Sequence, residues 1–156
     1  MTKTEVAALL AVCAAAYPHV NVTRETAAVY AEMLADLDYA DALAAVKRLI
    51  ATSQFFPTVA AIRETTVSLT APPIPSNAAA WAEVMLKIRE VGHYRAPEWS
   101  HPALAEAVAT IGWRELCMAD NLAVSRAHFW KVYETAARDA HKAAVLPASL
   151  RALEAP

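Results

Sequence analysis

Scarcity of glycine is the feature that most restricts the fold of this chain. Only two glycines, Gly92 and Gly112, occur in 156 residues. A β-sheet protein needs many tight turns, and most of these turns require glycine or asparagine. Much of the 57% hydrophobic content is alanine, the residue with the highest helix propensity. The sequence therefore predicts an all-α protein.

Four stretches with a helical hydrophobic period lie in the first 70 residues. Each follows a residue type that commonly caps the start of a helix, at Thr2, Thr23, Asp38 or Asp41, and Thr58. Glu5 stands three residues after the first of these caps, which is the spacing of a capping box. The short connections between the four stretches predict a small N-terminal four-helix bundle over residues 1–70.

A proline-rich stretch over residues 71–77 interrupts this pattern. Pro72, Pro73 and Pro75 oppose helix and favour an extended, stiff linker, so we expect a domain boundary here. Beyond it, the helical period resumes and predicts a C-terminal helical segment of three to four helices over residues 78–156. Two of these helices should end at the glycines, and Ser100 should cap one of them.

The sequence offers little support for catalysis or a cofactor. A P-loop needs two glycines five residues apart followed by lysine, whereas the two glycines here are twenty apart. No two histidines stand four residues apart, the spacing that puts two metal ligands on one helical face. An acid–base pair of Glu98 with His93 or His101 is conceivable, but a solvated loop is the simpler interpretation. We expect no enzyme, no metal and no cofactor.

Targeting signals are also lacking. The first five residues do not have the basic start and long apolar core of a signal peptide. No apolar run reaches the roughly 20 residues that cross a bilayer. Cys13 and Cys117 match neither zinc-binding nor redox spacing and are expected to be small buried hydrophobes. The sequence predicts a cytoplasmic protein without a membrane partner.

Nucleic acid is a possible partner of the last long helix. The net charge is −2, but residues 121–156 carry five basic and three acidic side chains. The candidate residues, which mix basic and aromatic side chains, are Arg126, Trp130, Lys131, Arg138 and Lys142. Such interleaving can follow a phosphate backbone and stack bases. The alternative, which we favour, is an aromatic stripe that faces the core with an ordinary solvated face beside it.

A protein partner is expected at Phe55-Phe56, just before a proline–threonine helix start. Neighbouring side chains leave the backbone in different directions, so one ring should pack under the first helix and the other should stay exposed. The exposed ring should lie beside Arg63, and an aromatic next to an arginine is typical of a binding hot spot. Trp99, in the loop that precedes Ser100, is a further candidate.

Several segments of the first half resemble the phage replicative-helicase loader and inhibitor family. The matching segments are Ala16-Tyr17-Pro18, Thr26-Ala27-Ala28-Val29-Tyr30, Ala42 through Ile50, and Phe55 through Glu64. The resemblance covers residues 5–69. It implies a small helical domain that binds the hexameric replicative helicase and acts with an origin-binding initiator, without hydrolysing ATP. The family's helicase-contacting part is a mobile C-terminal region, whereas residues 78–146 here are predicted to fold.

The sequence thus predicts a non-enzymatic phage or prophage adaptor that loads or inhibits the replicative helicase. One alternative is a DNA-binding replication or regulatory protein that uses the basic last helix. Another is a small helical inhibitor or scaffold of a different phage complex.

Overall fold

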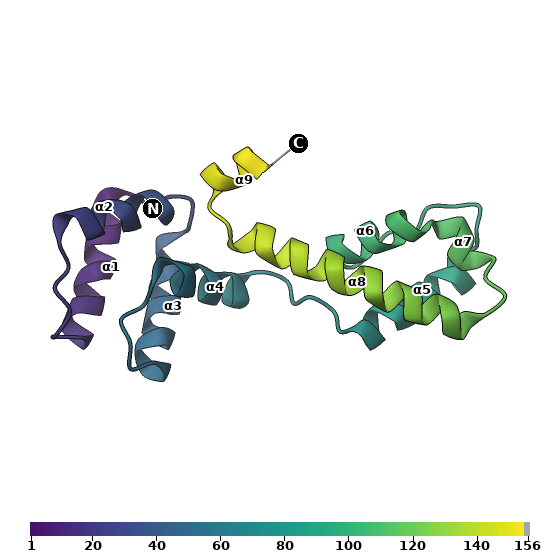
Figure 1. Ribbon diagram of the computed structural model, residues 1–156, viewed down its shortest axis with the longest axis horizontal. Helices are drawn as coiled ribbons and strands as arrows, with labels where there is room; N and C mark the ends of the chain where they lie inside the picture. Colours follow the sequence, from purple (N-terminus) through teal and green to yellow (C-terminus); the bar gives the residue numbers. More distant parts are fainter. Residues whose placement is uncertain (155–156) are drawn as a thin grey trace. The chain divides into compact units, whose positions relative to one another are not determined.

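The computed structural model describes residues 1–154 (Figure 1). Within this range the chain forms nine helices and no strand, which confirms the all-α prediction. The chain divides into two compact units. Unit 1 comprises residues 1–71 together with the described residues from 144 onward, and unit 2 comprises residues 72–143. No helix in the described range combines the length and the apolar character needed to cross a membrane.

Unit 1 contains four helices before residue 71 and one short helix near the end of the chain. Their bounds are α1 Lys3–Ala16, α2 Arg24–Met33, α3 Tyr39–Thr52, α4 Val59–Thr70 and α9 Ala148–Glu154. Helix α1 packs against α2 and α3, and α3 packs against α4. A cluster of small and aliphatic side chains forms the core, namely Leu9, Cys13, Leu34, Ala42, Val46 and Ile62.

Side-chain caps start the first four helices, as the sequence predicts. Thr2 accepts a hydrogen bond from the amide of Glu5 at 3.3 Å, and the Glu5 carboxylate accepts one from the amide of Thr2 at 2.7 Å, which completes the capping box. Thr23, Asp38 and Thr58 cap α2, α3 and α4 in the same way. A cap of this kind contributes about 1 kcal/mol by satisfying amide groups that the helix leaves unpaired.

Residues 144–154 differ from the expected division of the chain. The sequence assigns them to a C-terminal segment that begins at residue 78, whereas the structure groups them with unit 1. The reason is a set of polar contacts between this segment and Asp36 and Arg63, which lie far away in the sequence. Unit 2 is therefore inserted between two parts of unit 1.

Unit 2 contains four helices. They are α5 Asn77–Val91, α6 Pro102–Ile111, α7 Trp113–Cys117 and α8 Leu122–Val145, of which the last two residues belong to unit 1. The backbone adopts positive φ at Gly92 (+68°) and Gly112 (+102°), which end α5 and α6 as predicted. Only glycine adopts these angles without strain.

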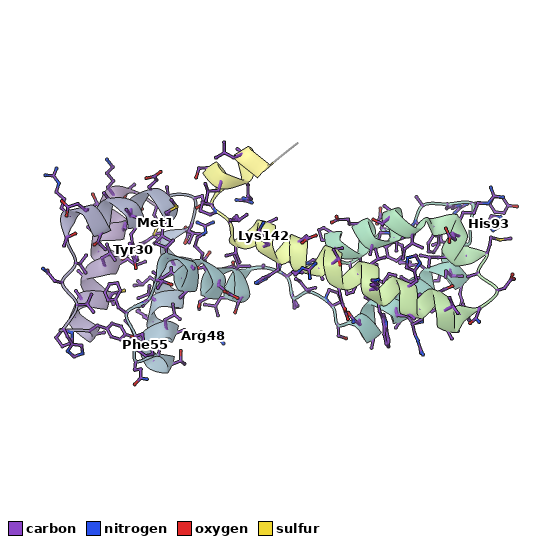
Figure 2. All side chains as sticks on the ribbon, viewed as in Figure 1. Met1, Tyr30, Arg48, Phe55, His93 and Lys142 are labelled. Carbon is purple, nitrogen blue, oxygen red and sulfur yellow. The ribbon has the colours of Figure 1, made fainter. Side chains whose placement is uncertain are left out.

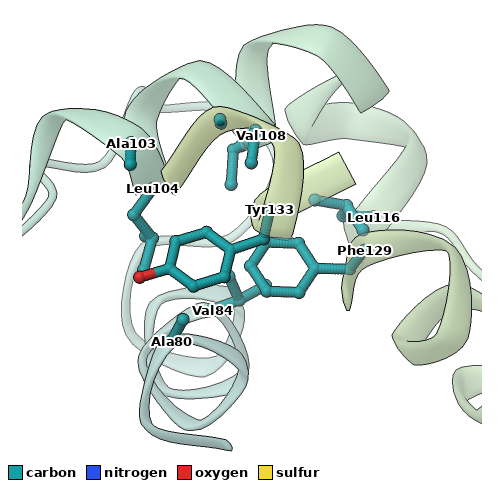
Figure 3. Packing of buried hydrophobic residues seen from close by; sticks show 10 residues of the cluster. Ala80, Val84, Ala103, Leu104, Val108, Leu116, Phe129 and Tyr133 are labelled. Carbon is teal, nitrogen blue, oxygen red and sulfur yellow. The ribbon is translucent and has the colours of Figure 1, made fainter. Parts of the chain in front are cut away.

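Large rings packed against alanines make the core of unit 2 (Figure 3). Phe129 and Tyr133 are fully buried on α8 and stack with ring centroids 5.6 Å apart. Trp81 of α5 adds a tilted contact to Phe129 at 5.4 Å. The space for these rings comes from small side chains on the surrounding helices, which are Ala80, Ala103, Ala107 and Ala136.

Two local expectations in unit 2 are wrong. Ser100 does not cap α6, because His101 is the cap and its Nδ1 accepts from the amide of Ala103 at 3.1 Å. Ser100 instead donates to the carboxylate of Glu83 through its amide and its hydroxyl. Part of the proline-rich stretch belongs to unit 2, since Ile74 packs on its core and the Pro75 carbonyl accepts from the Tyr133 hydroxyl at 2.7 Å.

Candidate partner-binding turn

The turn between α3 and α4 lacks helix for a local reason. Helix α3 ends at Thr52, and Ser53 is extended, with φ −125° and ψ 141°. Pro57 disfavours helical backbone at the residue before it, so the chain cannot continue α3 directly into α4. Thr58 then caps α4 by accepting from the amide of Ala61 at 3.1 Å. Residues 53–58 are therefore held between two defined helix ends.

Two tyrosine hydroxyls fix the backbone of this turn. Tyr17, at the end of α1, donates to the Ser53 carbonyl at 2.9 Å. Tyr30 of α2 donates to the Pro57 carbonyl at 2.9 Å, and burial raises the pKa of the Tyr30 phenol. The turn is thus fastened at both ends to other helices of unit 1. Nothing in the local hydrophobic period singled out either tyrosine for this role.

The two phenylalanines point in opposite directions, as predicted. Phe56 is partly buried against the unit 1 core, which includes Leu9. Its ring meets Tyr17 edge-on at 5.9 Å and Tyr30 edge-on at 6.4 Å. Phe55 is 73% exposed, and it lies on the outer side of the turn (Figure 2). The sequence did not decide which of the two faces inward.

Arg63 does not lie exposed beside Phe55, so that part of the prediction is wrong. Its side chain is 2% exposed. Nη1 donates to the Met33 carbonyl at 2.8 Å and to Asp36 Oδ1 at 2.6 Å, and Nη2 donates to Asp36 Oδ2 at 3.0 Å. A buried charge requires such partners, because an unpaired guanidinium would lose its hydration without compensation. Arg63 is a structural group of unit 1.

Trp99 also departs from the expected exposed hot spot. It is partly buried on the unit 2 core and meets Trp113 edge-on at 5.6 Å. Trp113 in turn donates from Nε1 to the Gly92 carbonyl at 3.0 Å. The exposed aromatic of this loop is Tyr94, which is 89% exposed and lies against the ring of His93.

The candidate nucleic-acid residues on α8 do not share one face. Trp130 is partly buried on the core, and the Arg126 guanidinium lies over its ring at 5.2 Å. Lys131, Arg138 and Lys142 are exposed, and their spacing of seven and four residues places them along one solvent-facing side of the helix. The aromatic rings therefore face the core, and the basic stripe lacks the stacking platform that the sequence suggested.

The polar loop before α6 contains no arrangement that would favour catalysis. The His101 ring nitrogen serves as the α6 cap, and His93 packs on Tyr94. Throughout residues 1–154 no three histidine, cysteine or acidic side chains gather as they would around a metal ion. Burial raises the pKa of the Cys13 thiol to about 11, so this group stays protonated and unreactive at neutral pH.

Comparison with protein families identifies the first part of the chain. Residues 1–63 match the family model for the N-terminal domain of a phage helicase loader and inhibitor. This confirms the resemblance for those residues, which include the Phe55-Phe56 turn. Searches of curated proteins and of solved structures give no match for the chain.

Proposed function

We propose, from the match of residues 1–63 to the N-terminal domain of phage helicase loaders and inhibitors, that this chain binds a hexameric replicative helicase and loads it or holds it inactive. That match is the observation that carries the proposal. The chain would act as a phage or prophage replication adaptor in the cytoplasm, where an origin-binding initiator could be a second partner.

The turn at Phe55 is the contact that we assign to the helicase. An exposed phenylalanine offers a large apolar surface, and aromatic side chains are enriched at the energetic centres of interfaces. The tyrosine bonds to Ser53 and Pro57 hold the turn before binding. A preorganised turn loses little conformational entropy on association, which favours affinity.

The proposed adaptor performs no chemistry of its own. Loading requires a protein that binds one conformation of the helicase ring more tightly than another, because a ligand shifts an equilibrium only by its differential affinity. ATP hydrolysis would remain with the helicase. DNA binding through α8 has weaker support, because its buried rings cannot stack bases.

A pull-down with the purified hexameric helicase of the same phage or its host tests this function. We expect the full-length chain to bind and Phe55→Ala to weaken binding by roughly tenfold or more, as for a hot-spot residue. Tyr94→Ala, which removes an exposed aromatic from unit 2, is the matched control and should bind normally.

Two results would count against the proposal in different ways. If the unmodified chain does not bind the helicase, the adaptor function is wrong. If it binds and Phe55→Ala binds equally well, the helicase contact lies on another surface.

A further inference from the structure

The ion pair between Arg63 and Asp36 does more than stabilise α4 against the turn that follows α2. Arg63 Nε donates to the carbonyl of Val145, at the end of α8. The Oδ2 atom of Asp36 accepts from the amide of Ala148 at 3.1 Å, the first residue of α9. The same oxygen lies 3.6 Å from Nη2 of Arg151. The pair thus binds a carbonyl and an amide three residues apart, on either side of Pro147.

The segment that carries these groups is held mainly by polar contacts. Among residues 144–153, whose side chains the structure describes, only Pro147 is buried. Leu150 is 37% exposed and Leu153 is 80% exposed. Little apolar surface therefore opposes detachment of this segment, since the favourable energy of burial scales with the apolar area removed from water.

Detachment would leave the rest of unit 1 satisfied. Arg63 keeps both bonds to Asp36 and the bond to the Met33 carbonyl when residues 144–154 leave. Only the Nε–H group of Arg63 and part of the Asp36 carboxylate lose their partners, and water can replace them. The core of α1 to α4 contains no residue of this segment.

We infer that the Arg63–Asp36 pair is a recognition site for the start of a helix, and that residues 145–151 of this chain occupy it as a releasable latch. While the latch is closed, it covers the outward donor of Arg63 and the outward oxygen of Asp36. When it opens, unit 1 presents both groups, and α9 is free of unit 1. This inference stands on the contacts of unit 1 and is independent of the proposed helicase partner.

Limited trypsin digestion of the full-length chain tests the latch at the bond after Arg151. The test variant is Ala148→Pro, which removes the amide that donates to Asp36 and keeps a residue suited to the first position of a helix. We expect cleavage after Arg151 to accelerate roughly tenfold, because a hydrogen bond to a carboxylate is lost and cleavage follows the open population.

Three controls separate release of the segment from other effects. Cleavage after Lys47 and Arg48, within α3, reports unfolding of unit 1 and should not change. The peptide of residues 144–154, with and without the proline, measures the effect of the substitution on trypsin itself. Asp41→Asn removes an exposed carboxylate of the same unit and should leave cleavage after Arg151 unchanged.

Asp36→Asn provides a second variant, in which cleavage after Arg151 should also accelerate. Faster cleavage after Arg151 with unchanged cleavage in α3 supports the latch. Unchanged cleavage in Ala148→Pro overturns it. An increase that only parallels cleavage in α3 overturns it as well, because the segment would then be an inseparable part of unit 1.

Discussion

Unit 1 and unit 2 are both helical, but they bury different kinds of side chain. The unit 1 core consists of aliphatic and small residues, with a buried arginine at its edge. The unit 2 core consists of stacked rings on α8 surrounded by alanines. The helix starts of unit 1 carry threonine and aspartate caps, whereas two helices of unit 2 end at glycine.

This difference teaches where each unit is vulnerable. Unit 2 depends on a few large side chains, so truncating one of them leaves a cavity that alanine neighbours cannot fill. Unit 1 spreads its apolar contacts over smaller groups and depends on one charged pair that links α2, α4 and the end of the chain. Packing should therefore dominate the stability of unit 2, and electrostatics should be a distinctive part of the stability of unit 1.

The largest expected effect is that of Phe129→Ala in unit 2. Loss of this fully buried ring should reduce the free energy of unfolding of unit 2 by about 3–5 kcal/mol. All four tryptophans lie in unit 2, so their fluorescence during urea unfolding reports that unit. Alkylation of the buried Cys13 reports unit 1 and should keep its midpoint. Equal shifts of both midpoints would show that the units unfold together.

A somewhat smaller effect is expected for Arg63→Met in unit 1. It leaves the Asp36 carboxylate and the Met33 carbonyl without their donor, and removing one partner of a buried pair costs about 3 kcal/mol. Cys13 alkylation should then begin at lower urea, while tryptophan fluorescence stays unchanged. The control is Arg138→Met, whose arginine side chain is 74% exposed and should matter little. A neutral result for Arg63→Met would mean that methionine packing replaces the ion pair.

Acid should weaken unit 1 through the same pair. Hydrogen bonds from Arg63, with its charge, hold the pKa of Asp36 below the ordinary value of 3.8. A lowered carboxyl pKa stabilises the fold above the ordinary value, and this stabilisation is lost as the pH falls below 3.8 and through the lowered pKa. Cys13 alkylation in urea, measured from pH 5 downwards on the order of one pH unit at a time, should detect the loss. In Asp36→Asn this part of the pH dependence should disappear.

The smallest effect is expected at the exposed ring of the α3–α4 turn. Phe55→Ala should change the free energy of unfolding by less than about 1 kcal/mol, because its side chain is 73% exposed. Phe56→Ala removes a partly buried ring that contacts two tyrosines and should cost about 3 kcal/mol. Thermal unfolding followed by circular dichroism measures both. Equal losses of stability would contradict the assignment of one inward and one outward ring.

Helix positions in this protein follow largely from the sequence. Thr2, Thr23 and Thr58 each cap a helix through an amide three residues later, so the signal and its effect lie within one turn of the chain. Gly92 and Gly112 likewise end helices through their own backbone angles. The all-α fold and the existence of an exposed phenylalanine in the turn could be predicted from such local rules. The partner-binding role of Phe55 stays a prediction.

Only the tertiary structure decided which groups serve these helices from a distance. The Arg63–Asp36 pair joins residues 27 positions apart, and the bond from Arg63 to Val145 spans 82. The tyrosine hydroxyl that holds Ser53 comes from 36 residues earlier. Hydrophobic periodicity records which face of a helix is apolar, but it does not record which distant polar group that helix will meet. The burial of Arg63 and the return of residues 144–154 to unit 1 therefore appear only when the helices are packed together.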